Sequence, residues 1–172
     1  MERDGLRATQ APLKQRYAAE PEAALVTLVA EGSLGEGISC SVSTGRAIAE
    51  AGLHPASGGD GSLLCSGDML LEALAACAGV TLRAVATSLG IGVRSGRVRA
   101  EGDLDFRGTL GVDREVPVGF AAIRLLIEVD SDADDEQLAT LCKLTERYCV
   151  VYQTLLGGST LSTEIVAASP SS

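Results

Sequence analysis

Cysteine is the residue type in this chain with the clearest capacity for chemistry. Its thiolate is a strong nucleophile that can be oxidised and reduced again. The five cysteines are scattered, with no CxxC pair, at positions 40, 65, 77, 142 and 149. An odd number at such spacings does not indicate a secreted disulfide framework. We therefore expect a cytoplasmic protein whose thiols are mostly reduced.

The chain contains a single histidine, His54, in a glycine-rich stretch at residues 53–62. A histidine-rich metal site is therefore excluded, and a histidine-based catalytic triad could use only this residue. The stretch also lacks the Gly-Lys-Ser/Thr ending of a phosphate-binding loop. We expect no metal and no bound cofactor, and we interpret these glycines as turn positions.

Length and charge narrow the function further. With 172 residues the chain is most simply a single domain, residues 1–172, in which residues 1–11 are expected to form a flexible tail. The formal charge of −9 and the lack of a Lys/Arg cluster argue against binding to nucleic acid or to an anionic membrane surface. The polar, charged start of the chain predicts no signal peptide.

The stretch from Ser66 to Gly90 is predicted to be one long helix around Cys77. Leu, Ala and Met dominate it, Ser66 suits an N-cap, and Gly90 suits a C-terminal cap. Its longest uncharged run, residues 73–82, is well short of the ~20 apolar residues that a bilayer requires. Because the helix is apolar on nearly every face, we expect a core helix that is buried all round.

The rest of the chain alternates between strand and helix patterns. A second helix, rich in acidic residues at its start, is predicted over residues 132–156 and contains Cys142 and Cys149. Strands are predicted on both sides of the two helices, over residues 24–31, 38–44, 92–108, 116–130 and 161–167. This order indicates an α+β fold in which antiparallel strands wrap around two core helices.

The spacing of the cysteines limits which of them can react together. Cys142 and Cys149 would lie two helical turns apart, ~10 Å, which is too far for a disulfide. Cys149 could pair with Cys77 only if the two helices pack side by side. Cys40 alternates with apolar residues and is interpreted as a core residue. Residue chemistry alone leaves open whether Cys77 is a reactive thiol or a small buried hydrophobe.

Two motifs resemble the OsmC/Ohr family of osmotically inducible and organic-hydroperoxide-resistance proteins. The first is Gly-Asp-Met-Leu-Leu-Glu-Ala-Leu-Ala-Ala-Cys77, and the second is Glu-Arg-Tyr-Cys149 further along the chain. The similarity extends over most of the sequence, from about residue 24 to residue 167. It implies an OsmC-like α+β fold in which antiparallel sheets wrap around two long central helices, and an intertwined homodimer.

The resemblance also implies an activity. Cys77 would be the peroxidatic thiol of a hydroperoxide reductase that takes part in the oxidative stress response, and Cys149 would be the resolving thiol. An external dithiol would then reduce the disulfide. The alternative is a dimer of the same fold that does not turn over, and that responds to oxidants or binds a small apolar ligand. A third possibility is a structural dimer in which all the cysteines only pack.

The chain departs from the family pattern at the residues that would ionise the thiol. Family peroxidases use an arginine held by a glutamate ahead of the cysteine helix, but here that glutamate position falls on Gly67. Asp68 and Arg46 are the candidate helpers, and Val150 replaces a proline that often follows the second cysteine. A position in the middle of a helix does not give Cys77 the help of that helix's own N-terminus. Further candidate helpers are Arg83, Glu146, Arg147 and His54.

Overall fold

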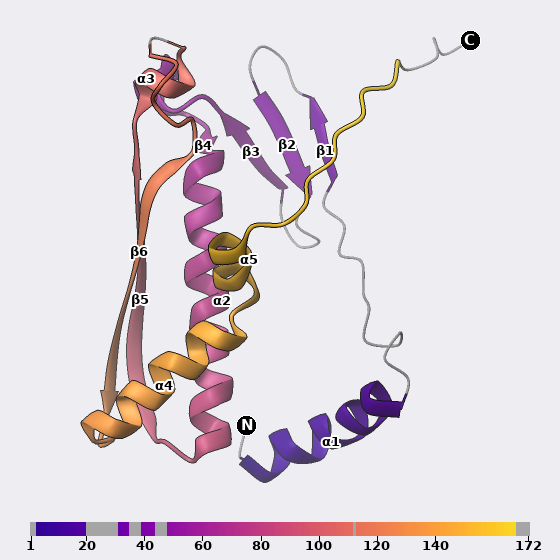
Figure 1. The fold of residues 1–172 in the computed structure, drawn as a ribbon, viewed down its shortest axis with the longest axis vertical. Helices are drawn as coiled ribbons and strands as arrows, with labels where there is room; N and C mark the ends of the chain where they lie inside the picture. The colour runs from indigo at the N-terminus through magenta and orange to yellow at the C-terminus, as the bar shows by residue number, and fades with distance from the viewer. Residues whose placement is uncertain (1–2, 20–30, 35–38, 44–47, 112, 168–172) are drawn as a thin grey trace.

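The computed structural model describes residues 3–19, 31–34, 39–43, 48–111 and 113–167, and its fold is α+β as predicted (Figure 1). The helices are α1 (Arg3–Ala19), α2 (Ser66–Leu89), α3 (Phe106–Thr109), α4 (Asp135–Tyr148) and α5 (Val150–Gly157), with a 3-10 turn, η2 (Pro55–Ser57). The strands are β1 (Glu31–Leu34), β2 (Ser39–Ser43), β3 (Ile48–Gly52), β4 (Leu64–Cys65), β5 (Val93–Leu104) and β6 (Phe120–Ser131).

Helix α2 is the central element, and it buries one stripe of its surface. The stripe has a spacing of four residues, as expected for one side of a helix: Leu74, Ala78, Leu82 and Ala86. The helix ends at Gly90, whose φ of 75° is the left-handed conformation of a C-terminal cap, as predicted. The N-cap is Cys65 rather than Ser66, and it makes no side-chain capping hydrogen bond.

The prediction that α2 is buried all round is wrong for the single chain. Strand β5 and helices α4 and α5 contact α2, so one side is covered, but Val80 on another side is 73% exposed. By length and composition alone α2 is apolar enough to cross a membrane, a test that core helices of soluble proteins also pass. The described residues therefore leave an apolar face of α2 uncovered.

The long hairpin of β5 and β6 forms a wall along α2 (Figure 1). The two strands are antiparallel, with Arg97 opposite Glu128, which confirms the strands predicted over residues 92–108 and 116–130. Alternation puts apolar side chains on the inner face against the helices: Val98, Ala100, Ile123, Leu125, Ile127 and Val129. The hairpin also carries exposed ion pairs, in which Arg94 meets Asp130 and Asp132, and Arg124 meets Asp103.

The second sheet has the strand order β1-β2-β3-β4. Strands β1 and β2 pair antiparallel. Strand β2 falls within the strand predicted at residues 38–44, whereas β1 begins at Glu31, where the strand predicted at residues 24–31 ended. Residues 24–30 and Ile38 lie outside the described residues. Strand β3 pairs antiparallel with β2, but β4 pairs parallel with β3, so this sheet is not purely antiparallel.

The predicted second helix is interrupted. Its start is confirmed, because Asp134 and Gln137 form a capping box there. At Cys149, however, the backbone is extended (φ −74°, ψ 108°), so α4 ends at Tyr148 and α5 begins at Val150. This break decides the geometry of the site described below.

The two ends of the chain differ from the sequence predictions. A helix, α1, covers residues 3–19, although residues 1–11 were predicted to be a flexible tail, because good helix formers continue on both sides of Pro12. The last predicted strand, residues 161–167, has no regular structure, and Leu161 and Ile165 are 89% and 94% exposed. No described strand pairs with this segment, and a strand needs a partner edge.

Candidate active site at two thiols

The structure brings Cys77 and Cys149 together. Both are free thiols and belong to one apolar cluster with Leu74 and Ala78, formed where α2 packs against α4 and α5. Cys77 is half-buried, whereas Cys149 is fully buried at 0% exposure. The two helices therefore do pack side by side, which the sequence left open and which a disulfide between these residues requires.

The break at Cys149 turns the start of α5 toward Cys77. In a continuous helix, the N–H groups of Val150 and Val151 would donate to carbonyls four residues earlier. At the start of α5 they are instead free of the α4 ladder, and they hydrogen-bond to the Cys77 sulfur in its charged form. Cys77 therefore lies in the middle of its own helix but at the N-terminus of another one, where the helix dipole favours a thiolate.

Opposing effects set the acidity of Cys77. Burial is the largest influence and acts to raise the pKa, but the hydrogen bonds outweigh it. These come from the Val151 N–H, the Cys149 thiol, the Val150 N–H and the Thr81 hydroxyl, and together they hold the pKa of Cys77 below that of an ordinary thiol. No charged side chain of the described residues contributes to this shift.

Cys149 shifts in the opposite direction. Burial is the largest influence and raises its pKa, and the Tyr152 backbone N–H opposes this; the neighbouring Cys77, by hydrogen bonding and charge, raises the pKa further, and the Val151 N–H lowers it least, so the net shift is upward. Cys77 is thus the first of the two to ionise. Cys149 stays protonated, and its S–H group donates a hydrogen bond to the Cys77 thiolate. The pair consists of a nucleophile and a protonated neighbour.

The predicted helper residues do not meet at this pair. Arg46 lies outside the described residues. Asp68 is in the first turn of α2, nine positions before Cys77, a separation that corresponds to ~14 Å along the helix. The structure does not bring the Asp68 carboxylate to the sulfur, and the roles of both residues stay predictions.

The other charged candidates have contacts elsewhere. Arg83 donates to the Val93 carbonyl on β5, and the Arg147 guanidinium lies 5.6 Å from the ring centre of Tyr148. His54 accepts the Ala56 N–H at Nδ1, 3.0 Å, and its ring stacks on Phe106 with centres 4.9 Å apart. The histidine therefore caps a turn, which is a structural role.

Sequence reasoning missed the residues that act on Cys77 most directly, Val150 and Val151. Their side chains carry no chemistry, because the backbone N–H groups make the interaction. One signal could have revealed them. The proline that the related family often places after its second cysteine is a residue favoured at the first position of a helix, which indicates a helix start there rather than a helix interior.

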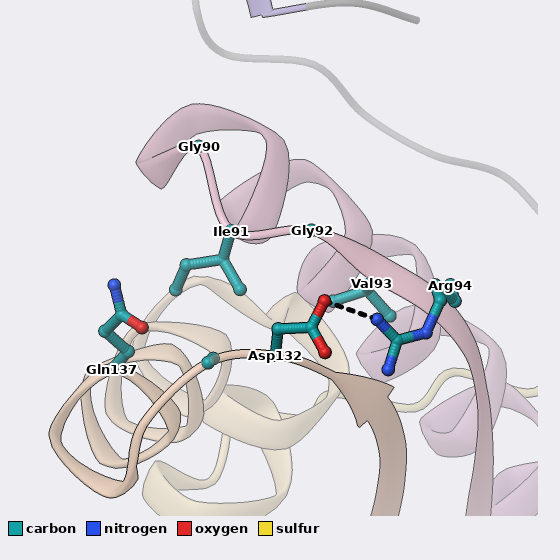
Figure 2. Close-up of a pocket in the computed structure, with 8 residues that line it drawn as sticks. Gly90, Ile91, Gly92, Val93, Arg94, Asp132 and Gln137 are labelled. Carbon is teal, nitrogen blue, oxygen red and sulfur yellow. Dashed lines mark hydrogen bonds and ion pairs between the residues drawn. The ribbon is translucent and has the colours of Figure 1, made fainter.

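Open clefts on the described surface include one far from the thiols and one beside them. One, of about 400 Å³, is formed by Gly90–Arg94, Asp132, Ala133 and Gln137 (Figure 2). It is ~20 Å along α2 from Cys77, and ion pairs with Asp130 and Asp132 neutralise its Arg94. The other, of about 420 Å³, borders Cys149 and is lined by residues of α4, α5 and the segment that follows: Arg147, Tyr148, Val150, Gln153, Thr154, Gly158 and Ser159.

A metal site is not formed by the described residues. No group of three or more His, Cys, Asp or Glu side chains in that part of the chain is placed to hold an ion.

Comparison with known proteins places the chain in a family. A family model described as OsmC-like protein matches residues 59–164, a range that contains both Cys77 and Cys149. No curated protein matches the chain in sequence. The chain belongs to the OsmC-like family, which confirms the resemblance and the fold class predicted from the sequence.

Solved structures share the fold at low sequence identity. An OsmC-like protein from Mycoplasma pneumoniae has a TM-score of 0.65 at 18% identity, over 77% of this chain and 89% of that one. An organic hydroperoxide resistance protein OsmC from Legionella pneumophila has a TM-score of 0.61 at 18% identity, over 78% and 92%. The organic hydroperoxide resistance protein OhrB of Bacillus subtilis has a TM-score of 0.55 at 19% identity, over 78% and 94%.

Proposed function

We propose that this protein reduces organic hydroperoxides, with Cys77 as the peroxidatic thiol and Cys149 as the resolving thiol. The observation that carries the proposal is the contact between two thiols of unequal acidity, with the more acidic one at the N-terminus of α5. Family membership supports redox chemistry of this kind, since similar structures include hydroperoxide resistance proteins.

The first step uses the thiolate that α5 favours. The Cys77 sulfur attacks the terminal peroxide oxygen and the O–O bond breaks. The alkoxide takes up a proton and leaves as the alcohol, and Cys77 becomes a sulfenic acid. The peroxide is reduced by two electrons and the sulfur is oxidised by two.

The second step uses Cys149. Its sulfur attacks the Cys77 sulfur, the S–OH bond breaks, and the hydroxide leaves as water with the proton of the Cys149 thiol. An external dithiol then attacks the disulfide, passes through a mixed disulfide, and closes into its own disulfide while both protein thiols are restored. No bound cofactor is needed, and a reducing cytoplasm would supply the dithiol.

The walls around the thiols favour an organic substrate. Cys77 packs among apolar side chains of the β5–β6 hairpin, namely Val98, Ala100, Ile123 and Leu125. An alkyl or aryl group gains free energy when it leaves water for such a surface, whereas hydrogen peroxide has no group to bury. We therefore expect a preference for organic hydroperoxides over hydrogen peroxide.

We further propose a homodimer as the working form. Beyond Val80 on α2, large apolar side chains are exposed on α5 and in the last segment: Val150, Leu155, Leu156, Leu161, Ile165 and Val166. Large apolar side chains left exposed on several elements are a common feature of an interface, and a second copy would cover the uncovered face of α2. Light scattering after size-exclusion chromatography tests this, and a monomer at micromolar concentration would contradict it.

One observation favours the alternative, a redox-responsive or ligand-binding dimer without fast turnover. The described residues provide no arginine–carboxylate pair among the groups that shift the pKa of Cys77. The thiolate would then depend on neutral hydrogen-bond donors, and these stabilise charge less strongly than a guanidinium does.

The two functions differ in turnover. Consumption of cumene hydroperoxide and of hydrogen peroxide is measured with a dithiol reductant, for the wild type, Cys77→Ser and Cys149→Ser. The proposal predicts faster turnover with cumene hydroperoxide, no activity in Cys77→Ser, and a stalled sulfenic acid in Cys149→Ser. Oxidation of the thiols without turnover would move the assignment to the redox-responsive alternative.

A further inference from the structure

The carbonyl groups at the end of α4 receive hydrogen bonds in an unusual order. The Cys149 N–H donates to the Thr145 carbonyl, 2.9 Å, as in a regular helix. The next carbonyl, that of Glu146, instead accepts from the side chain of Gln153, whose Nε2 lies 3.0 Å away. The same residue donates its backbone N–H to the Cys149 carbonyl, also 2.9 Å.

Gln153 therefore occupies the place of a backbone donor. In an uninterrupted helix the Glu146 carbonyl would accept the N–H of Val150, four residues later. Here the Gln153 amide fills that position from the next helical turn, so the carbonyl stays satisfied although the helix is broken. The Val150 N–H is then available to another acceptor.

We propose that Gln153 is a positioning residue for the reactive thiol: by bridging α4 and α5 through the Glu146 carbonyl, it holds the break at Cys149 in the form that faces the Val150 and Val151 N–H groups toward the Cys77 sulfur. Gln153 is exposed and does not touch the sulfur. It acts through the angle between the two helices. Its side chain holds the Glu146 carbonyl of α4, and its backbone N–H holds the Cys149 carbonyl at the start of α5.

In the surroundings of Cys77, this helix start is a main source of the hydrogen bonds that oppose burial and favour the thiolate. On α2 its polar neighbour is the uncharged Thr81, and on the β5–β6 side its neighbours are apolar. From α4 and α5 the titratable groups packed against it are Cys149 and Tyr152. Glu146 interacts with the Tyr152 hydroxyl, so its carboxylate acts one residue further away.

The test measures the acidity of Cys77 directly in the full-length reduced protein. The rate of alkylation of Cys77 by iodoacetamide is followed against pH by peptide mass spectrometry, for the wild type and Gln153→Met, which has a similar length and helix propensity but no N–H donor. The matched control is Thr154→Met, at the adjacent exposed position of α5. Gln153→Lys restores a donor at the same position.

Gln153→Met is expected to raise the pKa of Cys77 and to slow its alkylation at pH 7 roughly three- to tenfold, since part of the amide stabilisation is lost. Thr154→Met and Gln153→Lys are expected to stay within about twofold of the wild type. The inference is overturned if Gln153→Met alkylates like the wild type, if Thr154→Met is slowed equally, or if Gln153→Lys does not recover the rate.

A variant that does not fold is replaced by Gln153→Ala, which truncates the side chain and is compared with Gln153→Lys by the same criteria. The inference rests on the proposed function in taking Cys77 as the reacting thiol. The assay uses no peroxide, so it tests the inference separately from the proposed function. If the pKa of Cys77 depends on Gln153 but the protein is inactive, only the proposed function fails. If the protein is active but the pKa of Cys77 does not depend on Gln153, only the inference fails.

Discussion

Replacing Val150 with proline removes one hydrogen-bond donor from Cys77 while preserving the fold. Val150 is the first residue of α5 and its side chain is 70% exposed. Proline is favoured at this position of a helix, because the first N–H groups have no partner within the helix. The preceding residue, Cys149, already has the extended backbone that a following proline requires.

The size of the effect follows from the lost bond. A hydrogen bond to a charged group contributes roughly 1.5–3 kcal/mol, and the lower end applies to the half-buried Cys77. A loss of about 1.4 kcal/mol corresponds to a tenfold smaller thiolate population at a pH below the pKa. The Val151 N–H and the Cys149 thiol remain, so the pKa of Cys77 rises but the shift is not abolished.

The assay again is alkylation of Cys77 against pH, with Val150→Ala as the control that keeps the N–H. Val150→Pro is expected to react about tenfold more slowly at pH 7. At a pH low enough to protonate Cys77, it is expected to unfold about 1–4 °C higher, because proline restricts the unfolded chain at a compatible site. Equal alkylation of the two variants would refute the role of this backbone donor.

Further outcomes follow from packing and acidity elsewhere in the structure. The Thr145 hydroxyl is buried at 1% exposure and has no hydrogen-bond partner among the described residues, so Thr145→Val is expected to raise the free energy of unfolding in urea by about 1–3 kcal/mol; a lower value would contradict it. Gly102→Ala would place a Cβ 2.6 Å from the Phe120 ring and is expected to cost about 1–3 kcal/mol in the same assay. Gly79→Ala, whose Cβ would meet Val98 at an ordinary 3.6 Å, is expected to stabilise by about 0.5–1 kcal/mol; equal effects of the two alanines would refute the packing argument. Burial and Glu146 raise the pKa of the Cys142 thiol. Cys77 should therefore alkylate at lower pH than Cys142, although Cys142 is more exposed. The reverse order in peptide mapping would contradict the assignment of Cys77 as the more acidic thiol.

The sequence was a good guide to the elements that bury apolar residues with a clear period. Helix α2 ends at Gly90 as predicted, and the β5–β6 hairpin follows the predicted alternation. Where the described residues do not cover an apolar side chain, the hydrophobic pattern of the sequence predicts burial that the structure does not show. Val80 and the segment at residues 161–167 are apolar in sequence yet exposed in the structure.

The two thiols were identified by type and by resemblance, but the source of their acidity was not predictable. The sequence pointed to charged side chains, Arg46 and Asp68, as the groups that would ionise Cys77. In the described structure, backbone N–H groups favour the thiolate instead. The break at Cys149 has no proline or glycine to mark it, and Gln153 stabilises it from the next turn. Since helical periodicity continues across residue 149, the pattern indicates one helix where there are two.

The most direct test of the account is the product of a single oxidation. The reduced protein is treated with one equivalent of cumene hydroperoxide, and its peptides are mapped by mass spectrometry. The account predicts a Cys77–Cys149 disulfide in the wild type and a sulfenic acid on Cys77 in Cys149→Ser. Oxidation that falls on Cys65 or Cys142 while Cys77 and Cys149 stay reduced would contradict it.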